Sequence, residues 1–259
     1  MTANALAAYR LKSAYRTKAI PPMRDLIEPH DAENAYSIQQ INTTMWVSEG
    51  RRIVGRKVGL TAKSVQIQLG VDQPDFGVLF DDMAIANGGM LSPLHVLQPK
   101  AEGEVAFIMA ADVHDPDVTR DQVAAAIGSV VAAIEIVDSR IEDWKITFAD
   151  TVSDNGSSAF FVLGSDPKPL KGLDLWTCGM ALEVNGEVVS SGAGVACMGH
   201  PLNAVTWLAR TLAARGESLR KGDIVLSGAL GPMFAIHPGD VVRATIGGLG
   251  SASFTYAKT

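Results

Sequence analysis

The chain has 259 residues, enough for one large domain or two small ones. Its 47% hydrophobic and 19% charged residues are typical of a folded globular protein and exclude an intrinsically disordered chain. The formal net charge of −6 argues against nucleic acid as a partner, and no apolar stretch approaches the length of a membrane span.

The N-terminal part of the chain is predicted to be helical. Helices are expected over residues 3–18 and 31–49, the second with Asp31 as its N-cap. The basic, Ala-rich start can resemble an organelle transit peptide, but it lacks a signal-peptide core and suits an ordinary amphipathic helix. We therefore expect residues 1–50 to form a small helical region.

Beyond this region the pattern changes to short strands punctuated by Gly, Pro and Asp. Strands are predicted at 53–58, 103–109, 131–137, 223–227, 240–246 and 251–256. Asn185-Gly186 predicts a hairpin, and Pro201 starts a helix over 202–214. The irregular alternation, without a dinucleotide or phosphate-binding glycine loop, predicts an α+β fold, with residues 51–259 as one β-rich catalytic domain.

The two cysteines, Cys178 and Cys197, show no metal-ligand or redox spacing. We expect both to be small core residues without a disulfide. This usage is typical of a reducing compartment and predicts a cytoplasmic protein.

Three acidic residues carry the strongest chemical signal. Glu102 and Glu104 lie two residues apart in a predicted strand, so their side chains share one face. Glu135 is the only charge in the apolar run 130–137 and is expected to be buried, which is costly unless it pairs or binds a metal. Converging carboxylates call for a cation, and oxygen ligands suit Mg²⁺ or Mn²⁺. The alternative is that the Glu-x-Glu pair lies on a solvent-exposed face.

Two further residues suggest acid–base chemistry. Lys57 lies between glycines at a strand end, where a lysine can hold a substrate carboxylate, or transfer protons if its pKa is depressed. Asp75 lies in a predicted turn and is a candidate base. An exposed lysine and a turn-capping aspartate are the ordinary alternatives.

A polar loop is expected over residues 150–158, where the composition is typical of a ligand-facing segment. His200 and His237 have no serine or cysteine nucleophile in a recognisable elbow nearby, which argues against a hydrolytic triad.

Taken together, six motifs in order resemble the 2-hydroxypenta-2,4-dienoate (2-keto-4-pentenoate) hydratases, in the hydratase/decarboxylase branch of the fumarylacetoacetate hydrolase superfamily. They are Gly55-Arg-Lys-Val-Gly-Leu-Thr, Leu69-Gly-Val-Asp-Gln-Pro-Asp-Phe-Gly, Leu97-Gln-Pro-Lys-Ala-Glu-Gly-Glu, Val137-Asp-Ser-Arg-Ile-Glu-Asp-Trp, Asp150-Thr-Val-Ser-Asp-Asn and Gly199-His-Pro-Leu-Asn. The resemblance runs from about Ala35 to the C-terminus.

The resemblance implies a mixed β-roll core and a metal-dependent lyase. It assigns Mg²⁺ or Mn²⁺ to Glu102, Glu104 and Glu135, catalysis to Lys57 and Asp75, and substrate contacts to Ser157, Ser158 and Leu60. Small departures from the relatives, Ala101, Gly103 and Gly156, leave these residues intact and bear on the shape of the pocket at most.

The implied reaction adds water to C4 of a 2-hydroxy-2,4-dienoate (a 2-oxo-4-enoate), giving a 4-hydroxy-2-oxoacid in the meta-cleavage degradation of aromatic compounds. Three alternatives stay open: a 4-oxalocrotonate-type decarboxylase, an acylpyruvate hydrolase and a non-catalytic structural partner of a pathway enzyme. Val58 and the segment 73–76 favour the hydratases over the decarboxylases. The resemblance also implies a homo-oligomer, with a pentamer-based decamer as one arrangement, and allows association with neighbouring pathway enzymes.

Overall fold

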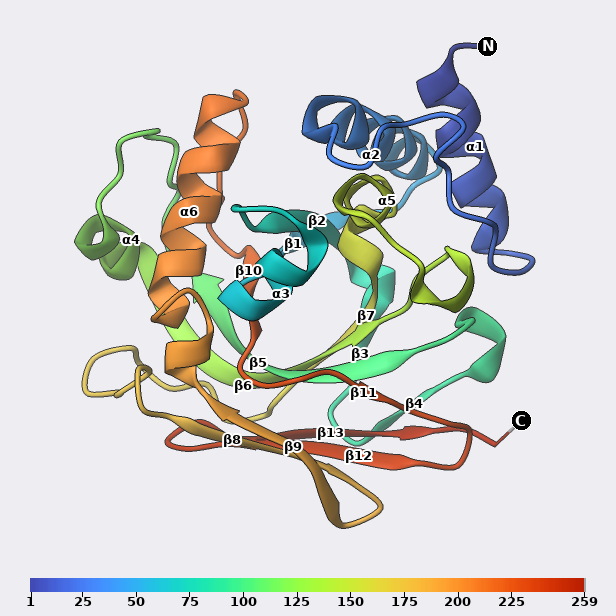
Figure 1. The fold of residues 1–259 in the computed structure, drawn as a ribbon. Coiled ribbons are helices and arrows are strands. Elements are labelled where there is room, and N and C mark those ends of the chain that lie inside the picture. The colour runs from blue at the N-terminus through green and yellow to red at the C-terminus, as the bar shows by residue number, and fades with distance from the viewer. Residues whose placement is uncertain (259) are drawn as a thin grey trace.

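The computed structural model describes residues 1–258, without the side chains of Gln68 and Leu69. Two β-sheets lie one above the other, with helices gathered at two sides of the larger sheet (Figure 1). No helix within the described part of the chain is both long and apolar enough to cross a membrane.

The N-terminal helices are α1 (Ala3–Ala14) and α2 (Ala32–Ser48), which pack on each other. Asp31 caps α2 as predicted, because its carboxylate accepts a hydrogen bond from the Asn34 N–H at 3.1 Å. The prediction that the first helix reaches residue 18 was wrong. The chain leaves the helix at Tyr15, whose ring packs edge-on against Trp46 at 5.2 Å between centroids.

The larger sheet has eight strands of mixed direction. They are β1 (Ile53–Gly59), β2 (Asp75–Phe80), β3 (Ala84–Ile85), β5 (Lys100–Met109), β6 (Ile127–Val137), β7 (Ser158–Leu163), β10 (Ile224–Ala229) and β11 (Phe234–Ala235). Their order is β2-β1-β10-β5-β6-β7-β3, with β11 paired to β5. Asp75 begins β2 and so lies in a strand, where the sequence predicted a turn.

The smaller sheet has five strands and packs against the larger one. They are β4 (Gly89–Leu91), β8 (Gly179–Val184), β9 (Glu187–Ala193), β12 (Val241–Ile246) and β13 (Gly250–Tyr256), in the order β4-β13-β12-β8-β9. The predicted hairpin at Asn185-Gly186 joins β8 and β9, with φ of 54° and 86°.

Between the two sheets the packing is close. A Cβ on Gly103 would lie 2.8 Å from the Met180 sulfur, so a larger residue here would have to displace the flexible Met180 side chain. Gly103 therefore fits the contact between the sheets, on the face of β5 opposite Glu102 and Glu104.

Four further helices complete the fold: α3 (Lys63–Leu69), α4 (Arg120–Ala126), α5 (Phe148–Ser153) and α6 (Pro201–Ala214). Helix α6 begins at Pro201 as predicted. The polar segment 150–158, expected to be a loop, is half helical. A capping box between Thr147 and Asp150 starts α5 there, and the chain turns only after Ser153.

The larger sheet is rolled. Strands β1 and β6 are separated by β10 and β5, which in a flat sheet would put them about 14 Å apart. Yet Lys57 Nζ on β1 lies 3.4 Å from Glu135 Oε2 on β6. The inner face holds an apolar cluster of Trp46, Val78, Leu79, Phe80, Met83, Ala106, Val131, Ala133, Phe161 and Leu226. The predicted α+β fold with a mixed β-roll core is therefore confirmed.

Candidate active site

The three glutamates lie on the inner face of the roll, beside its apolar cluster. Glu102 and Glu135 are direct partners across β5 and β6, and Glu104 follows on the same face of β5. All three line one cavity of about 670 Å³, together with Lys57 and Asp75. Residues predicted from four separate segments of the sequence thus meet in one place.

Two of the acids are deeply buried. Glu104 and Glu135 are each 1% exposed, and Glu102 is partly buried, which excludes a solvent-exposed face for the Glu102–Glu104 pair and confirms that Glu135 is buried. Glu104 Oε2 accepts a hydrogen bond from the Gly228 N–H at 2.8 Å. The second oxygen of Glu135, Oε1, is buried without a hydrogen-bond partner. A buried carboxylate oxygen of this kind calls for a cation or a proton.

Burial and neighbouring carboxylates raise the pKa values of Glu102 and Glu104. Burial raises the pKa of Glu102 to about 7, and the Glu135 carboxylate adds to the rise. Burial, followed by Glu135 and Glu102, raises the pKa of Glu104 well above its usual range. The negative charge of this group of carboxylates is therefore only partly compensated by the protein itself.

A divalent cation fits these donors by type, because carboxylate oxygens are the ligands preferred by hard cations. Within residues 1–258, no three His, Cys, Asp or Glu side chains already stand in the arrangement of a finished metal site. The side chains of Glu102, Glu104 and Glu135 would therefore have to come closer together to share one ion.

Lys57 is buried beside the acids, at 4% exposure, and pairs with Glu135. Burial alone lowers the pKa of Lys57, but the carboxylates of Glu135, Asp75, Glu102 and Glu104 outweigh it and raise that pKa above its usual value. The sequence allowed for a depressed pKa and a lysine able to give up its proton. The surrounding carboxylates instead favour the ammonium form of Lys57.

Asp75 faces the same group from β2. Its Oδ1 atom is buried without a hydrogen-bond partner, and burial raises the pKa of the carboxyl. Gly59 is its partner across β1 and β2, and a Cβ there would lie 2.2 Å from Oδ1. The glycine before Leu60 is thus required by the position of Asp75.

Of the three predicted substrate contacts, two line the cavity. They are Leu60, with φ of 54°, and Ser157, whose hydroxyl lies 3.1 Å from that of Thr151. Ser158 does not line the cavity, and its hydroxyl is buried without a hydrogen-bond partner. The structure therefore gives no reason to place Ser158 at the substrate.

Sequence reasoning missed Lys100 and Trp144, which also line the cavity. The Lys100 ammonium lies 4.3 Å from the centroid of the Trp144 ring. Strand alternation places Lys100 on the face of Glu102 and Glu104, so this residue was predictable from spacing. Trp144 has φ of 55° in an irregular turn, for which the sequence offers no signal. The rest of the wall includes Val65, Val137, Ile146, Ala196, Ala229, Pro232 and Met233.

Comparisons with known proteins agree with this architecture. Residues 53–256 match the family model described as fumarylacetoacetate (FAA) hydrolase C-terminal. A "2-keto-4-pentenoate hydratase" of Paraburkholderia xenovorans (strain LB400) is 52% identical over 95% of this chain and 91% of that protein. A "2-hydroxyhexa-2,4-dienoate hydratase" of Comamonas testosteroni is 40% identical, covering 96% of each chain.

Among solved structures, a 4-oxalocrotonate decarboxylase from Pseudomonas putida G7, complexed with magnesium and adipate, superposes with a TM-score of 0.93. It is 34% identical, and the match covers 98% of this chain and 97% of that one. The rolled fold, the cavity lined by acids and these relatives define an enzyme of the lyase class. The chain belongs to the fumarylacetoacetate hydrolase family.

Proposed function

We propose that this protein is a hydratase that adds water to C4 of a 2-hydroxy-2,4-dienoate, in the meta-cleavage degradation of aromatic compounds. The observation that carries the proposal is the meeting of Lys57, Asp75 and the three glutamates in one cavity. Hydratases that are 52% and 40% identical over almost the whole chain support this reaction over decarboxylation, for which the solved relative is 34% identical.

Glu102, Glu104 and Glu135 would hold the divalent cation. When bound, it would supply a Lewis acid for the carboxylate and 2-oxygen of the substrate. Two structures of the decarboxylase of Pseudomonas putida G7, one complexed with magnesium and one with calcium, support a divalent metal. We assign Mg²⁺ or Mn²⁺, since both accept oxygen ligands and keep exchangeable waters.

Lys57 would bind the substrate carboxylate and take part in proton transfer. In the first stage the 2-hydroxyl loses its proton and C5 gains one, which gives a 2-oxo-3-enoate. The Lys57 ammonium would stabilise negative charge on the reacting chain and give a proton to C5, and the proton lost by the 2-hydroxyl would restore the ammonium. Its pairing with Glu135 in this structure holds the ammonium at the cavity wall.

Asp75 would orient the water and accept its proton as oxygen bonds to C4. The pKa of the Asp75 carboxyl is raised, and its Oδ1 atom has no hydrogen-bond partner. Both features suit a base that accepts a proton from the water. C3 then gains a proton, so that one water is added overall and the product is a 4-hydroxy-2-oxoacid. The Ser157 hydroxyl would donate a hydrogen bond to the substrate head, with Leu60 lining the same wall.

The assembly and location are further parts of the proposal. We expect a cytoplasmic homo-oligomer, with a pentamer-based decamer as one arrangement, and association with neighbouring pathway enzymes. The free, buried Cys178 and Cys197 support a reducing compartment. Sedimentation of the purified protein would test the oligomeric state.

The decisive test is a paired assay with Mg²⁺ or Mn²⁺. The loss of ultraviolet absorbance from 2-hydroxypenta-2,4-dienoate and from 4-oxalocrotonate is followed separately, with product masses determined. Gain of one water by the first substrate, abolished by a chelator and by Glu104→Gln, is expected. Glu187→Gln, an exposed change on β9, should leave the rate unchanged. Loss of CO₂ from the second substrate without hydration of the first would identify a decarboxylase instead.

A further inference from the structure

A turn of unusual backbone conformation, at residues 155–157, lies beside the cavity. Asn155, Gly156 and Ser157 have φ of 56°, 62° and 54°, three consecutive residues in the left-handed region. Only glycine adopts this region without cost, so the surrounding structure has to hold Asn155 and Ser157 there.

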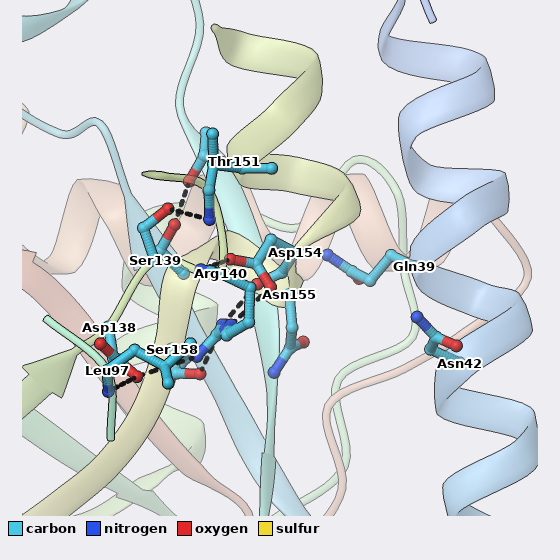
Figure 2. Close-up of polar contacts among 12 residues, drawn as sticks. Gln39, Asn42, Leu97, Asp138, Ser139, Arg140, Thr151, Asp154, Asn155 and Ser158 are labelled. Atoms are coloured by element: carbon cyan, nitrogen blue, oxygen red, sulfur yellow. Dashed lines mark hydrogen bonds and ion pairs between the residues drawn. The ribbon is translucent and has the colours of Figure 1, made fainter. Parts of the chain in front are cut away.

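The clamp on this turn is Arg140, which is fully buried and does not line the cavity. Its backbone N–H and Nε donate to the two carboxylate oxygens of Asp154 at 2.8 and 2.6 Å. Its Nη2 donates to the carbonyl oxygens of Asp154 and Ser158, at 2.9 and 3.2 Å. One guanidinium therefore contacts the residue before the turn and the residue after it, as Figure 2 shows.

The opposite side of the turn is fixed to the sheet. The Asn155 side chain accepts from the Val78 N–H at 2.7 Å and donates to the Val78 carbonyl at 2.9 Å. Gly156 then lies against the end of Lys57, because a Cβ on Gly156 would be 3.0 Å from Lys57 Cε. The Ser157 hydroxyl reaches Thr151, and Ser157 and Gly156 both line the cavity.

We propose that Arg140 is a positioning residue of this site. Through Asp154 and the two carbonyls it holds the left-handed turn, which in turn holds the Lys57 side chain and the Ser157 hydroxyl toward the cavity. The inference rests on the proposed function. A buried ion pair adds little net stability compared with apolar residues of the same size. Holding the conformation of the turn is therefore the better explanation for the Arg140–Asp154 pair.

Asp154→Asn tests the clamp with minimal change of shape. We expect kcat for hydration to fall about 100-fold through misplaced groups, with the affinity for Mn²⁺ unchanged because the three glutamates lie on β5 and β6. Asn42→Ala is the matched control. It removes a buried hydrogen bond to the Ala8 carbonyl on α1 and lowers stability without touching the turn (Figure 2). Equal loss of kcat in both variants would overturn the proposal.

A double variant separates positioning from folding. Arg140→Met with Asp154→Leu replaces both charges by apolar side chains, which commonly preserves stability. A folded double variant that has lost kcat supports the proposal, and one with wild-type kcat and KM overturns it. If neither variant folds, a crystal structure of the wild-type protein decides, because a turn without Arg140 contacts would refute the clamp.

Oxalate binding tests the role of Arg140 without depending on the proposed reaction. Oxalate mimics the two-carbon head of a 2-oxoacid, and its binding in the presence of Mn²⁺ needs no turnover. If the wild type hydrates no dienoate, the proposed function fails, but weaker oxalate binding in Asp154→Asn than in Asn42→Ala still supports the clamp. Equal oxalate binding in the two variants would contradict it.

Discussion

Lys57 and its surroundings show how single side chains set the chemistry of the cavity. An ammonium 3.4 Å from Glu135, buried among further carboxylates, is kept protonated by its neighbours. Burial of the same carboxylates without the Lys57 ammonium would cost free energy of folding. The Lys57 ammonium and the glutamates on β5 and β6 therefore stabilise one another's charges.

Replacing Lys57 by Met should remove the ammonium while preserving the bulk of the chain. We expect kcat to fall by about 100-fold or more, the usual range for loss of a positioned proton-transfer group. Steady-state assays with saturating Mg²⁺ measure the effect, with circular dichroism to show folding. Lys171→Met, an exposed change, serves as the control. Full turnover in Lys57→Met would remove this residue from the mechanism.

Gly59→Ala should displace Asp75. The added Cβ would lie 2.2 Å from Asp75 Oδ1 and 3.2 Å from Lys57 Nζ, so the Asp75 carboxylate has to shift. We expect kcat/KM to fall about 100-fold, the cost of a misplaced catalytic group. Gly179→Ala is the control, since a Cβ there would meet nothing within 4 Å. Similar activity of the two variants would show that Asp75 tolerates displacement.

Among the elements, α6 depends on a histidine. His200 is its N-cap, and Nδ1 accepts a hydrogen bond from the Leu202 N–H at 3.0 Å. Burial and the nearby Arg120 lower the pKa of His200, while Asp174 opposes them. Protonation would remove the acceptor and place a positive charge at the positive end of the helix.

The direction of the pKa shift of His200 determines how the free energy of unfolding depends on pH. Since the folded state lowers the pKa of His200, its contribution is present above its usual value of 6.5 and is lost as the pH falls below it. His200→Asn keeps a capping acceptor that does not titrate. We expect the variant to lose less free energy of unfolding than the wild type between pH 7.5 and 5, by about 1 kcal/mol. Parallel denaturant curves at the two pH values would contradict this.

At the scale of the whole molecule, the metal should stabilise the fold. A ligand that binds only the native state at 100 times its Kd adds about 2.7 kcal/mol. For a chain of this size we expect a rise in Tm of about 5–10 °C with Mg²⁺ or Mn²⁺. Differential scanning calorimetry before and after chelation measures it. Glu135→Gln should abolish the rise, whereas Glu187→Gln should keep it.

The helical region and the β-rich region should unfold together. The Ile20 N–H donates to the Arg140 carbonyl at 2.8 Å, and the Arg140 guanidinium lies 4.1 Å from the centroid of the Tyr15 ring. Through these contacts, residues 1–50 pack on Arg140, which holds the turn of residues 155–157. Hydrogen exchange along a denaturant series should give one midpoint for peptides of α2 and of β6. Separate midpoints would show two independent domains.

The sequence by itself determined the features that depend on near neighbours. Asp31 as a cap, Asn185-Gly186 as a hairpin and the shared face of Glu102 and Glu104 all follow from rules that act over two to four residues. The resemblance of the motifs then supplied the site residues. The end of α1 was misjudged because Tyr15 leaves the helix for contacts with Trp46 and Arg140, which are distant in sequence.

Only the tertiary structure decided how those pieces meet. Lys57 reaches Glu135 because the sheet is rolled, and the pKa of Lys57 is raised because four carboxylates surround it. Trp144 and Arg140 gained their roles in the same way, through contacts made by an irregular turn and a buried cluster. Such contacts join segments far apart in the chain, and their energies depend on burial and curvature that no local pattern encodes.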